Sequence, residues 1–121
     1  MPIFDMLYLI THAHTQQKRE QDATGWDLSP AGREQAAALA RLPFWAAVDR
    51  VVVSTEAKTR LTVAPVLAAR NLPLTVDPRF DELRRGREWV DDYAGRVAEG
   101  FAHPAQSVGG WERADDALAR F

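Results

Sequence analysis

The chain has 121 residues and a mass of 13.5 kDa, enough for one domain with its own hydrophobic core. A formal net charge of −2 gives no basic footprint for nucleic acid, and the absence of cysteine excludes disulfides and thiolate chemistry. No apolar run approaches the roughly 20 residues that span a membrane, and residues 1–5 lack the features of a signal peptide. We therefore expect a soluble, cytoplasmic protein with no nucleic-acid or membrane partner.

The first strong signal is Leu7–Ile10, four consecutive apolar residues that predict a strand buried on both faces. The run ends in two histidines, His12 and His14, which are flanked by Thr11 and Thr15. In open α/β sheets, ligands bind outside the carboxyl ends of the strands. This cluster is therefore the first candidate for a reaction site.

The next segments predict a loop, a helix and a second strand. Residues 16–27 are polar and indicate a loop long enough to cover a site. Ser29 followed by Pro30 is typical of a helix start, and Pro43 ends the small-residue apolar face that follows. Residues 50–54 then predict a buried strand that again ends in polar side chains.

A second helix is expected over residues 56–70, with a kink or a break into two helices at Pro65. Residues 72–76 predict a short third strand, for which Pro73 favours an edge position. Strands that alternate with helices in this way imply an α/β fold with a parallel sheet and right-handed crossovers. A sheet with an open edge could also pair with a second copy of the chain, so a homodimer is a reasonable expectation.

The stretch 77–89 is dense in charge, which is equally typical of a solvated loop and of a site. It contains a cluster of arginines, namely Arg84, Arg85 and Arg87. Their positive charge could steer an anionic ligand. A last helix is expected to begin near Asp91 or, after a glycine pair, near Trp111.

Four separated segments resemble the histidine phosphatase superfamily, which has the phosphoglycerate mutase-like fold. The family's Arg-His-Gly-Glu-Thr stands here as Thr-His-Ala-His-Thr at residues 11–15, and its Leu-Thr-x-x-Gly-x-x-Gln-Ala as Leu-Ser-Pro-Ala-Gly-Arg-Glu-Gln-Ala at residues 28–36. Its Ser-Ser-x-Leu-x-Arg-Ala-x-Gln-Thr-Ala resembles Ser-Thr-Glu-Ala-Lys-Thr-Arg-Leu-Thr-Val-Ala at residues 54–64. Its Leu-x-Glu-x-x-x-Gly-x-Trp resembles residues 80–89, with the tryptophan displaced by one. The resemblance implies a three-layer α/β/α sandwich with a mostly parallel sheet.

In that family, the histidine after the first strand attacks phosphorus and carries a phosphohistidine, while a carboxylic acid protonates the leaving oxygen. By position, the resemblance implies His12 as the nucleophile and Glu82 as the acid. The chemistry asks for an imidazole held in one tautomer and for cationic donors around the phosphoryl oxygens. It needs no cofactor or metal, and its partner is a small phosphorylated molecule or another anion.

The chain departs from the family pattern at the phosphate ligands. Thr11 and Thr59 replace two family arginines, so each position loses a bidentate donor. The second family histidine follows a late strand, and the only residue available for it, His103, lies in an Ala-His-Pro context. Family domains are also usually longer, and residues 1–121 are expected to lack the strand that carries this histidine.

Other side chains near these positions could compensate as phosphate ligands. Lys58 and Arg60 flank the lost arginine, His14 replaces a family acidic residue, and Thr11 keeps a hydroxyl. A shift of one residue along a helix turns a side chain by roughly 100°, so neither Lys58 nor Arg60 is expected to point the same way without local rearrangement.

Three hypotheses about function remain open from the sequence. The first is a phosphatase or phosphomutase that works through a phosphohistidine, with weak activity or none as a variant of it. The second is a non-catalytic binding or regulatory module that retains the fold. The third is a metal site at His12 and His14, because His-x-His after a first strand resembles the opening motif of amidohydrolases.

Overall fold

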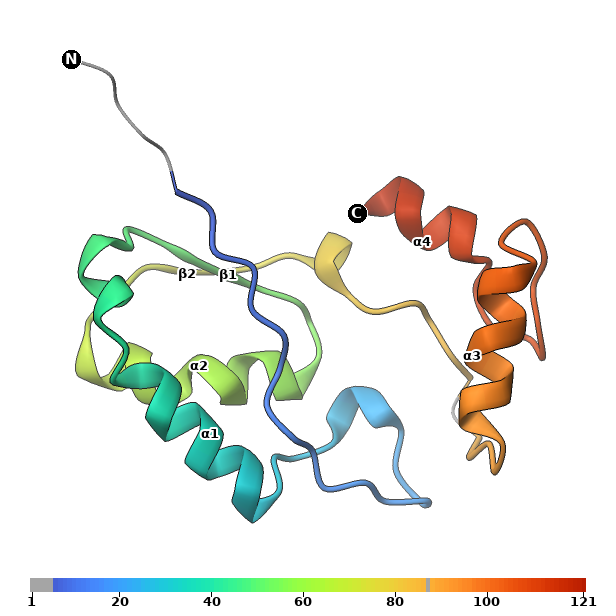
Figure 1. Cartoon of the computed structure of the whole chain (residues 1–121), viewed down its shortest axis with the longest axis horizontal. Coiled ribbons are helices and arrows are strands. Elements are labelled where there is room, and N and C mark those ends of the chain that lie inside the picture. Colours follow the sequence, from blue (N-terminus) through green and yellow to red (C-terminus); the bar gives the residue numbers. More distant parts are fainter. Residues whose placement is uncertain (1–5, 87) are drawn as a thin grey trace.

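The computed structural model describes residues 6–86 and 88–121 and shows a small α/β protein (Figure 1). Two strands and four α-helices follow one another along these residues, with short 3-10 helices between them. In chain order they are a 3-10 helix Ala23–Gly25, α1 Pro30–Ala40, a 3-10 helix Pro43–Ala47, β1 Val51–Val53, α2 Ala57–Ala69, β2 Leu74–Val76, a 3-10 helix Pro78–Phe80, α3 Tyr93–Ala102 and α4 Ala114–Arg120.

The sheet of the described residues consists of β1 and β2, which pair in parallel with Val51 opposite Leu74 and Val53 opposite Val76. Helix α2 connects the two strands, as a parallel pair requires. Figure 1 shows α1 and α2 on the same side of the sheet, and these two helices pack against each other. The expected α/β class, with a parallel sheet, is therefore confirmed.

The main hydrophobic core lies between the sheet, α2 and the 3-10 helix before β1. Its buried members are Trp45, Val51, Val53, Val63 and Val66. The Trp45 indole is 3% exposed, and its N–H donates to the carbonyl of Leu39 at 2.8 Å, so the ring is buried without an unpaired donor. This core fixes the ends of β1 and α2 from which the site is built.

A second, smaller core anchors residues 13–15 to the start of α1. Ala13, Leu28 and Ala36 are buried together, and the amide of Ser29 donates to the carbonyl of His14 at 3.0 Å. A Cβ atom at Gly32 would lie 2.0 Å from that same carbonyl oxygen, so only glycine allows this approach. As predicted, Ser29 caps the helix, since its hydroxyl accepts from the amide of Gly32.

The strand predicted at Leu7–Ile10 does not form among the described residues, and this prediction is wrong. Leu7 is 81% exposed and Leu9 is 77% exposed, although Tyr8 stacks on Phe44 with ring centroids 4.5 Å apart. A strand buried on both faces needs a paired neighbour and a cover on each face. Among the described residues, the segment pairs with no strand, and most of its side chains are exposed.

Two further expectations are corrected. Helix α2 runs continuously through Pro65, so the chain does not break into two helices there. The last helical region contains both α3 and α4 rather than a single helix. Among the described residues, no helix is long and apolar enough to cross a membrane.

Candidate functional site

His12 follows the exposed N-terminal segment and has a side chain 30% exposed to solvent. Its Nδ1 lies 2.6 Å from the carbonyl oxygen of Ala13. Because a carbonyl can only accept, Nδ1 carries a proton in this contact, and Nε2 keeps its lone pair when the ring is neutral. The amide of Ala13 donates to the hydroxyl of Thr62 at 2.9 Å, which ties this backbone to α2. Nε2 lies 3.5 Å from Oε1 of Glu82.

Lys58, in the first turn of α2, brings a buried ammonium group to the same place. Its side chain is 4% exposed, and Nζ lies 2.9 Å from Oε2 of Glu82 and 3.6 Å from Oε1 of Glu56. The side chain of Glu56 is also 4% exposed. The expected turn of about 100° therefore does not keep Lys58 away from the site, because its four-carbon stem is long enough to reach Glu82.

Glu82 contacts both His12 and Lys58. Its Oε2 accepts from Nη2 of Arg85 at 2.9 Å, and its amide donates to Oε2 of Glu56 at 2.9 Å. Burial alone would raise the pKa of Glu82, but the hydrogen bond and charge of Lys58, with smaller effects of Arg85 and His12, hold the pKa below its usual value. We call His12, Glu56, Lys58, Glu82 and Arg85 the site cluster.

The other predicted phosphate ligands lie outside the site cluster. Arg60 is exposed, and the described residues provide no partner for it. Thr11 is exposed as well. His14 is exposed, and its Nδ1 lies 2.6 Å from the hydroxyl of Ser29, so the contact that it makes is with the start of α1.

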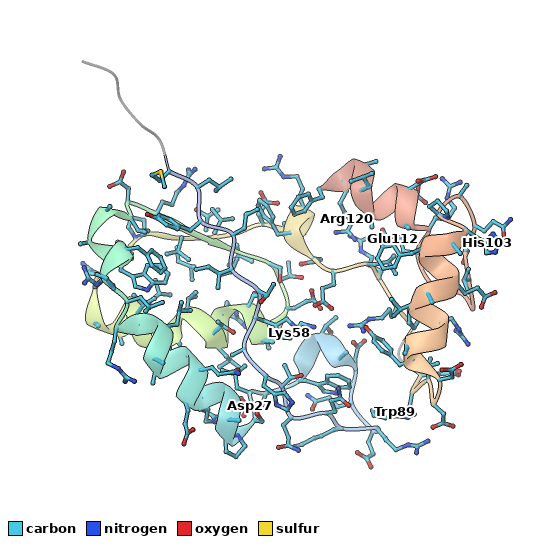
Figure 2. The ribbon with its side chains drawn as sticks, viewed as in Figure 1. Asp27, Lys58, Trp89, His103, Glu112 and Arg120 are labelled. Atoms are coloured by element: carbon cyan, nitrogen blue, oxygen red, sulfur yellow. The ribbon has the colours of Figure 1, made fainter. Side chains whose placement is uncertain are left out.

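Neither Thr59 nor His103 joins the site cluster. The hydroxyl of Thr59 donates to the carbonyl of Glu56 at 2.9 Å and lies 3.1 Å from the hydroxyl of Ser54, so it serves the start of α2. Figure 2 shows His103 at the outer side of α3, on the far side of that helix from Lys58. Among the described residues, no group of three or more histidine, aspartate or glutamate side chains could hold a metal ion.

The sequence did not single out two residues that shape the site. Glu56 precedes α2 by one residue, and a buried carboxylate next to Lys58 has no signature in a single sequence. Arg120, at the end of α4, donates to the carbonyls of Asp81 at 2.7 Å and of Glu82 at 3.2 Å. It also pairs with Glu112 at 2.6 Å, and Figure 2 shows these two side chains together.

The comparisons with known proteins show the family and the fold of the chain. A family model described as the histidine phosphatase superfamily (branch 1) matches residues 7–117. No curated protein matches the chain. Among solved structures, it is similar to a mycobacterial glucosyl-3-phosphoglycerate phosphatase in complex with VO3 (24% identity, TM-score 0.72). It is also similar to the α-ribazole phosphatase from Shigella flexneri (23%, 0.67) and to YhfR from Bacillus stearothermophilus (23%, 0.69).

These similarities cover 90% of the chain in each case, but 57%, 59% and 59% of the three solved chains. The chain thus spans little more than half of the length of the structures that it resembles. At these identities the likeness shows the fold, which is the phosphoglycerate mutase-like one.

Proposed function

Because the chain belongs to the histidine phosphatase superfamily, we propose that it cleaves a small phosphate ester through a phosphohistidine on His12. The contact of His12 Nε2 with Glu82, at 3.5 Å and beside the ammonium group of Lys58, carries this proposal. This arrangement supports the roles of His12 as nucleophile, Glu82 as acid and Lys58 as cation, because phosphoryl transfer requires these three groups close together.

In the first step, the Nε2 lone pair of His12 attacks phosphorus while the bond from phosphorus to the ester oxygen breaks. Glu82 gives its proton to the leaving oxygen, so the alcohol departs neutral. Water then attacks the phosphohistidine and returns a proton to the Glu82 carboxylate, which releases phosphate and restores the free imidazole. If another hydroxyl of the bound alcohol replaces water, the same sequence is a mutase reaction.

The pKa of Glu82 is low because its carboxylate neutralises Lys58 and Arg85. A phosphate dianion that binds to Lys58 and Arg85 takes over this role. Its negative charge also disfavours the ionised carboxylate, so the pKa of Glu82 rises as substrate binds. Substrate binding therefore prepares the acid for proton donation.

The direct test is hydrolysis of 4-nitrophenyl phosphate between about pH 5 and 8, the range in which histidine titrates. His12→Ala should abolish turnover, and a matched control, His14→Ala, should retain it because His14 lies outside the site cluster. Labelled phosphate should be trapped on the wild-type protein as an acid-labile adduct and should be missing from His12→Ala. Equal activity in both variants would overturn the proposal.

The role of Glu82 has its own test. A general acid matters when the leaving group is a poor one, so Glu82→Gln should slow hydrolysis of an alkyl phosphate by about 10²–10⁴. The same variant should hydrolyse 4-nitrophenyl phosphate much closer to the wild-type rate, because nitrophenolate leaves without a proton. An equal loss with both esters would assign Glu82 to phosphate binding or to structure instead of acid catalysis.

One observation favours a second candidate, a non-catalytic binding or regulatory module. Thr59 is used by the start of α2, and the remaining cations of the site cluster, Lys58 and Arg85, are both paired with Glu82. Binding of inorganic phosphate by the wild-type protein, without turnover of any ester and without a trapped phosphohistidine, would support this module and exclude the enzyme.

A further inference from the structure

A cavity of about 200 Å³ lies next to the site cluster, between α3 and the segment that leads into α4. Glu82 and Arg85 line it on the side of the site cluster, and the rest of its wall is mostly apolar. The apolar side chains of the wall are Leu83, Tyr93, Val97, Phe101, Val108 and Trp111. None of these residues belongs to the site cluster.

The charged side chains of this wall are already engaged, whereas the side-chain amide of Gln106 makes no hydrogen bond with the described residues. Arg85 donates to Glu82 and to the hydroxyl of Tyr93, and Arg96 donates to the carbonyl of Gly109. Glu112 accepts from Arg120 and from the amide of Arg84. A hydroxyl-rich guest such as a sugar would lose its hydrogen bonds to water and find few replacements here, which is unfavourable. An apolar guest makes no hydrogen bonds to water and therefore loses none on entering the cavity.

The volume of the cavity indicates what size of apolar group it can hold. An apolar cavity of about 150 Å³ in another protein is large enough to bind benzene. The rings of Tyr93 and Trp111, whose centroids are 5.8 Å apart, form one part of the wall here. A volume of about 200 Å³ therefore accommodates one ring with a short linker.

The cavity adjoins the proposed reaction centre, because Glu82 and Arg85 line the cavity and also belong to the site cluster. A phosphoryl group at His12 places the ester oxygen at Glu82, and the organic group attached to that oxygen then points toward the cavity. We propose that the substrate is a phosphate monoester whose alcohol carries a single compact apolar group, such as an aromatic ring, which binds among Tyr93, Val97, Phe101 and Trp111. This inference rests on the proposed function of His12 and Glu82.

Gly100 offers a way to fill the cavity without unfolding the protein. It lines the cavity, lies within α3, and a Cβ atom built on it meets nothing within 4 Å. Gly100→Leu therefore adds bulk where there is space, and it improves the helix propensity of α3. Ala98→Leu is the matched control, since Ala98 is exposed on the same helix and does not line the cavity.

The experiment measures binding of 2-phenylethylphosphonate and ethylphosphonate, two non-hydrolysable probes, by calorimetry. The phenyl probe should bind about tenfold tighter or more to the wild-type protein, as expected when an apolar pocket accepts an additional apolar group. Gly100→Leu should remove this preference and leave the affinity for ethylphosphonate unchanged. Ala98→Leu should keep the preference.

Equal affinities for the two probes, an unchanged preference in Gly100→Leu, or no binding of either probe would overturn the inference. Turnover of 4-nitrophenyl phosphate by wild type and His12→Ala, measured on the same preparations, reports on the proposed function separately. Turnover that depends on His12 together with equal probe affinities would leave the function standing and remove only the substrate class.

Discussion

The molecule has two halves, and each half is stabilised by a different kind of interaction. Residues 11–76, here called the sheet half, are built on buried apolar side chains around Trp45 and Val66. Residues 91–121, here called the helical half, contain one buried side chain among those that the structure describes, Trp111. The helical half relies on polar contacts instead, among them the pair of Arg120 with Glu112.

The proposed chemistry draws on both halves. His12 and Lys58 belong to the sheet half, while the cavity belongs mainly to the helical half. Glu82 lies on the connection between them, and Figure 1 shows this connection running from β2 to α3. Its backbone is bonded from both sides, through its amide to Glu56 and through its carbonyl to Arg120. The placement of Glu82 can therefore be lost while the sheet half stays folded.

The largest effect should come from the core of the sheet half. Trp45→Ala removes a side chain that is 3% exposed and should lower the free energy of unfolding by about 3–5 kcal/mol. Leu118→Ala in the helical half removes a side chain that is 73% exposed and should change the free energy of unfolding by less than about 0.5 kcal/mol. Urea denaturation measures both, and similar losses would contradict the division into two halves.

The next largest effect should come from Lys58, the charge that the sheet half contributes to the site cluster. Lys58→Met leaves the buried carboxylate of Glu56 close to Glu82 with no ammonium between them. Removal of one partner from a buried ion pair costs about 3–5 kcal/mol, and the partial exposure of Glu82 puts our expectation at the lower end of that range. The exposed Arg60 is the control, since Arg60→Met should change stability by less than about 0.5 kcal/mol.

Acidic pH should reduce the difference in the free energy of unfolding between the wild type and Lys58→Met. In the wild type, the pKa of Glu82 lies below 4.5, so the stability from its ion pairs is fully present above that pH and is lost as the pH falls through the lowered pKa. In the variant, Glu82 has lost the ammonium group of Lys58, so its protonation costs less stability as the pH falls. Denaturation curves at neutral and acidic pH measure this difference in the free energy of unfolding. A difference that increases at acidic pH would contradict the ion-pair assignment.

A smaller and local effect should follow from Arg120→Met. This change removes charged hydrogen bonds to the carbonyls of Asp81 and Glu82, of a kind worth about 1.5–3 kcal/mol. Amide exchange of Ala117 and Phe121 in the helical half should accelerate by roughly 30-fold, which corresponds to a loss near the lower end of that range. Exchange in β1 should stay unchanged. Arg113→Met, which removes an exposed pair with Asp116, should affect α4 less.

The parts of the fold that sequence reasoning predicted are those with local causes. The start of α1 follows from Ser29 and Pro30, which act through their own backbone neighbours. Strand β1 follows from three consecutive valines. The run Leu7–Ile10 has the same apolar pattern but forms no strand, because pairing and covering depend on residues far away in the sequence. A pattern shows which residues can be buried, and the rest of the structure decides whether they are.

The candidate site shows the same difference between what a sequence pattern predicts and what contacts between distant residues decide. The resemblance to the family was enough to propose His12 and Glu82, which the structure brings to within 3.5 Å of each other. Helix geometry alone was not enough for Lys58, because a long flexible side chain can leave the direction that its backbone sets. The contact of Glu56 with Lys58 and the reach of Arg120 to Glu82 are tertiary, so a single sequence carries no signal for them.

The smallest effect on stability is expected at Leu9, and it tests the correction of the first strand. Leu9→Ser changes a side chain that is 77% exposed, so the free energy of unfolding should change by less than about 0.5 kcal/mol. The control is Leu28→Ser, at a residue 5% exposed, for which a loss of about 2–5 kcal/mol is expected. Denaturation at several protein concentrations separates the alternatives. A large loss for Leu9→Ser at every concentration would mean that the chain itself covers the segment. A loss that grows with concentration would mean that a second copy covers it, as the expected homodimer requires, because only association depends on concentration.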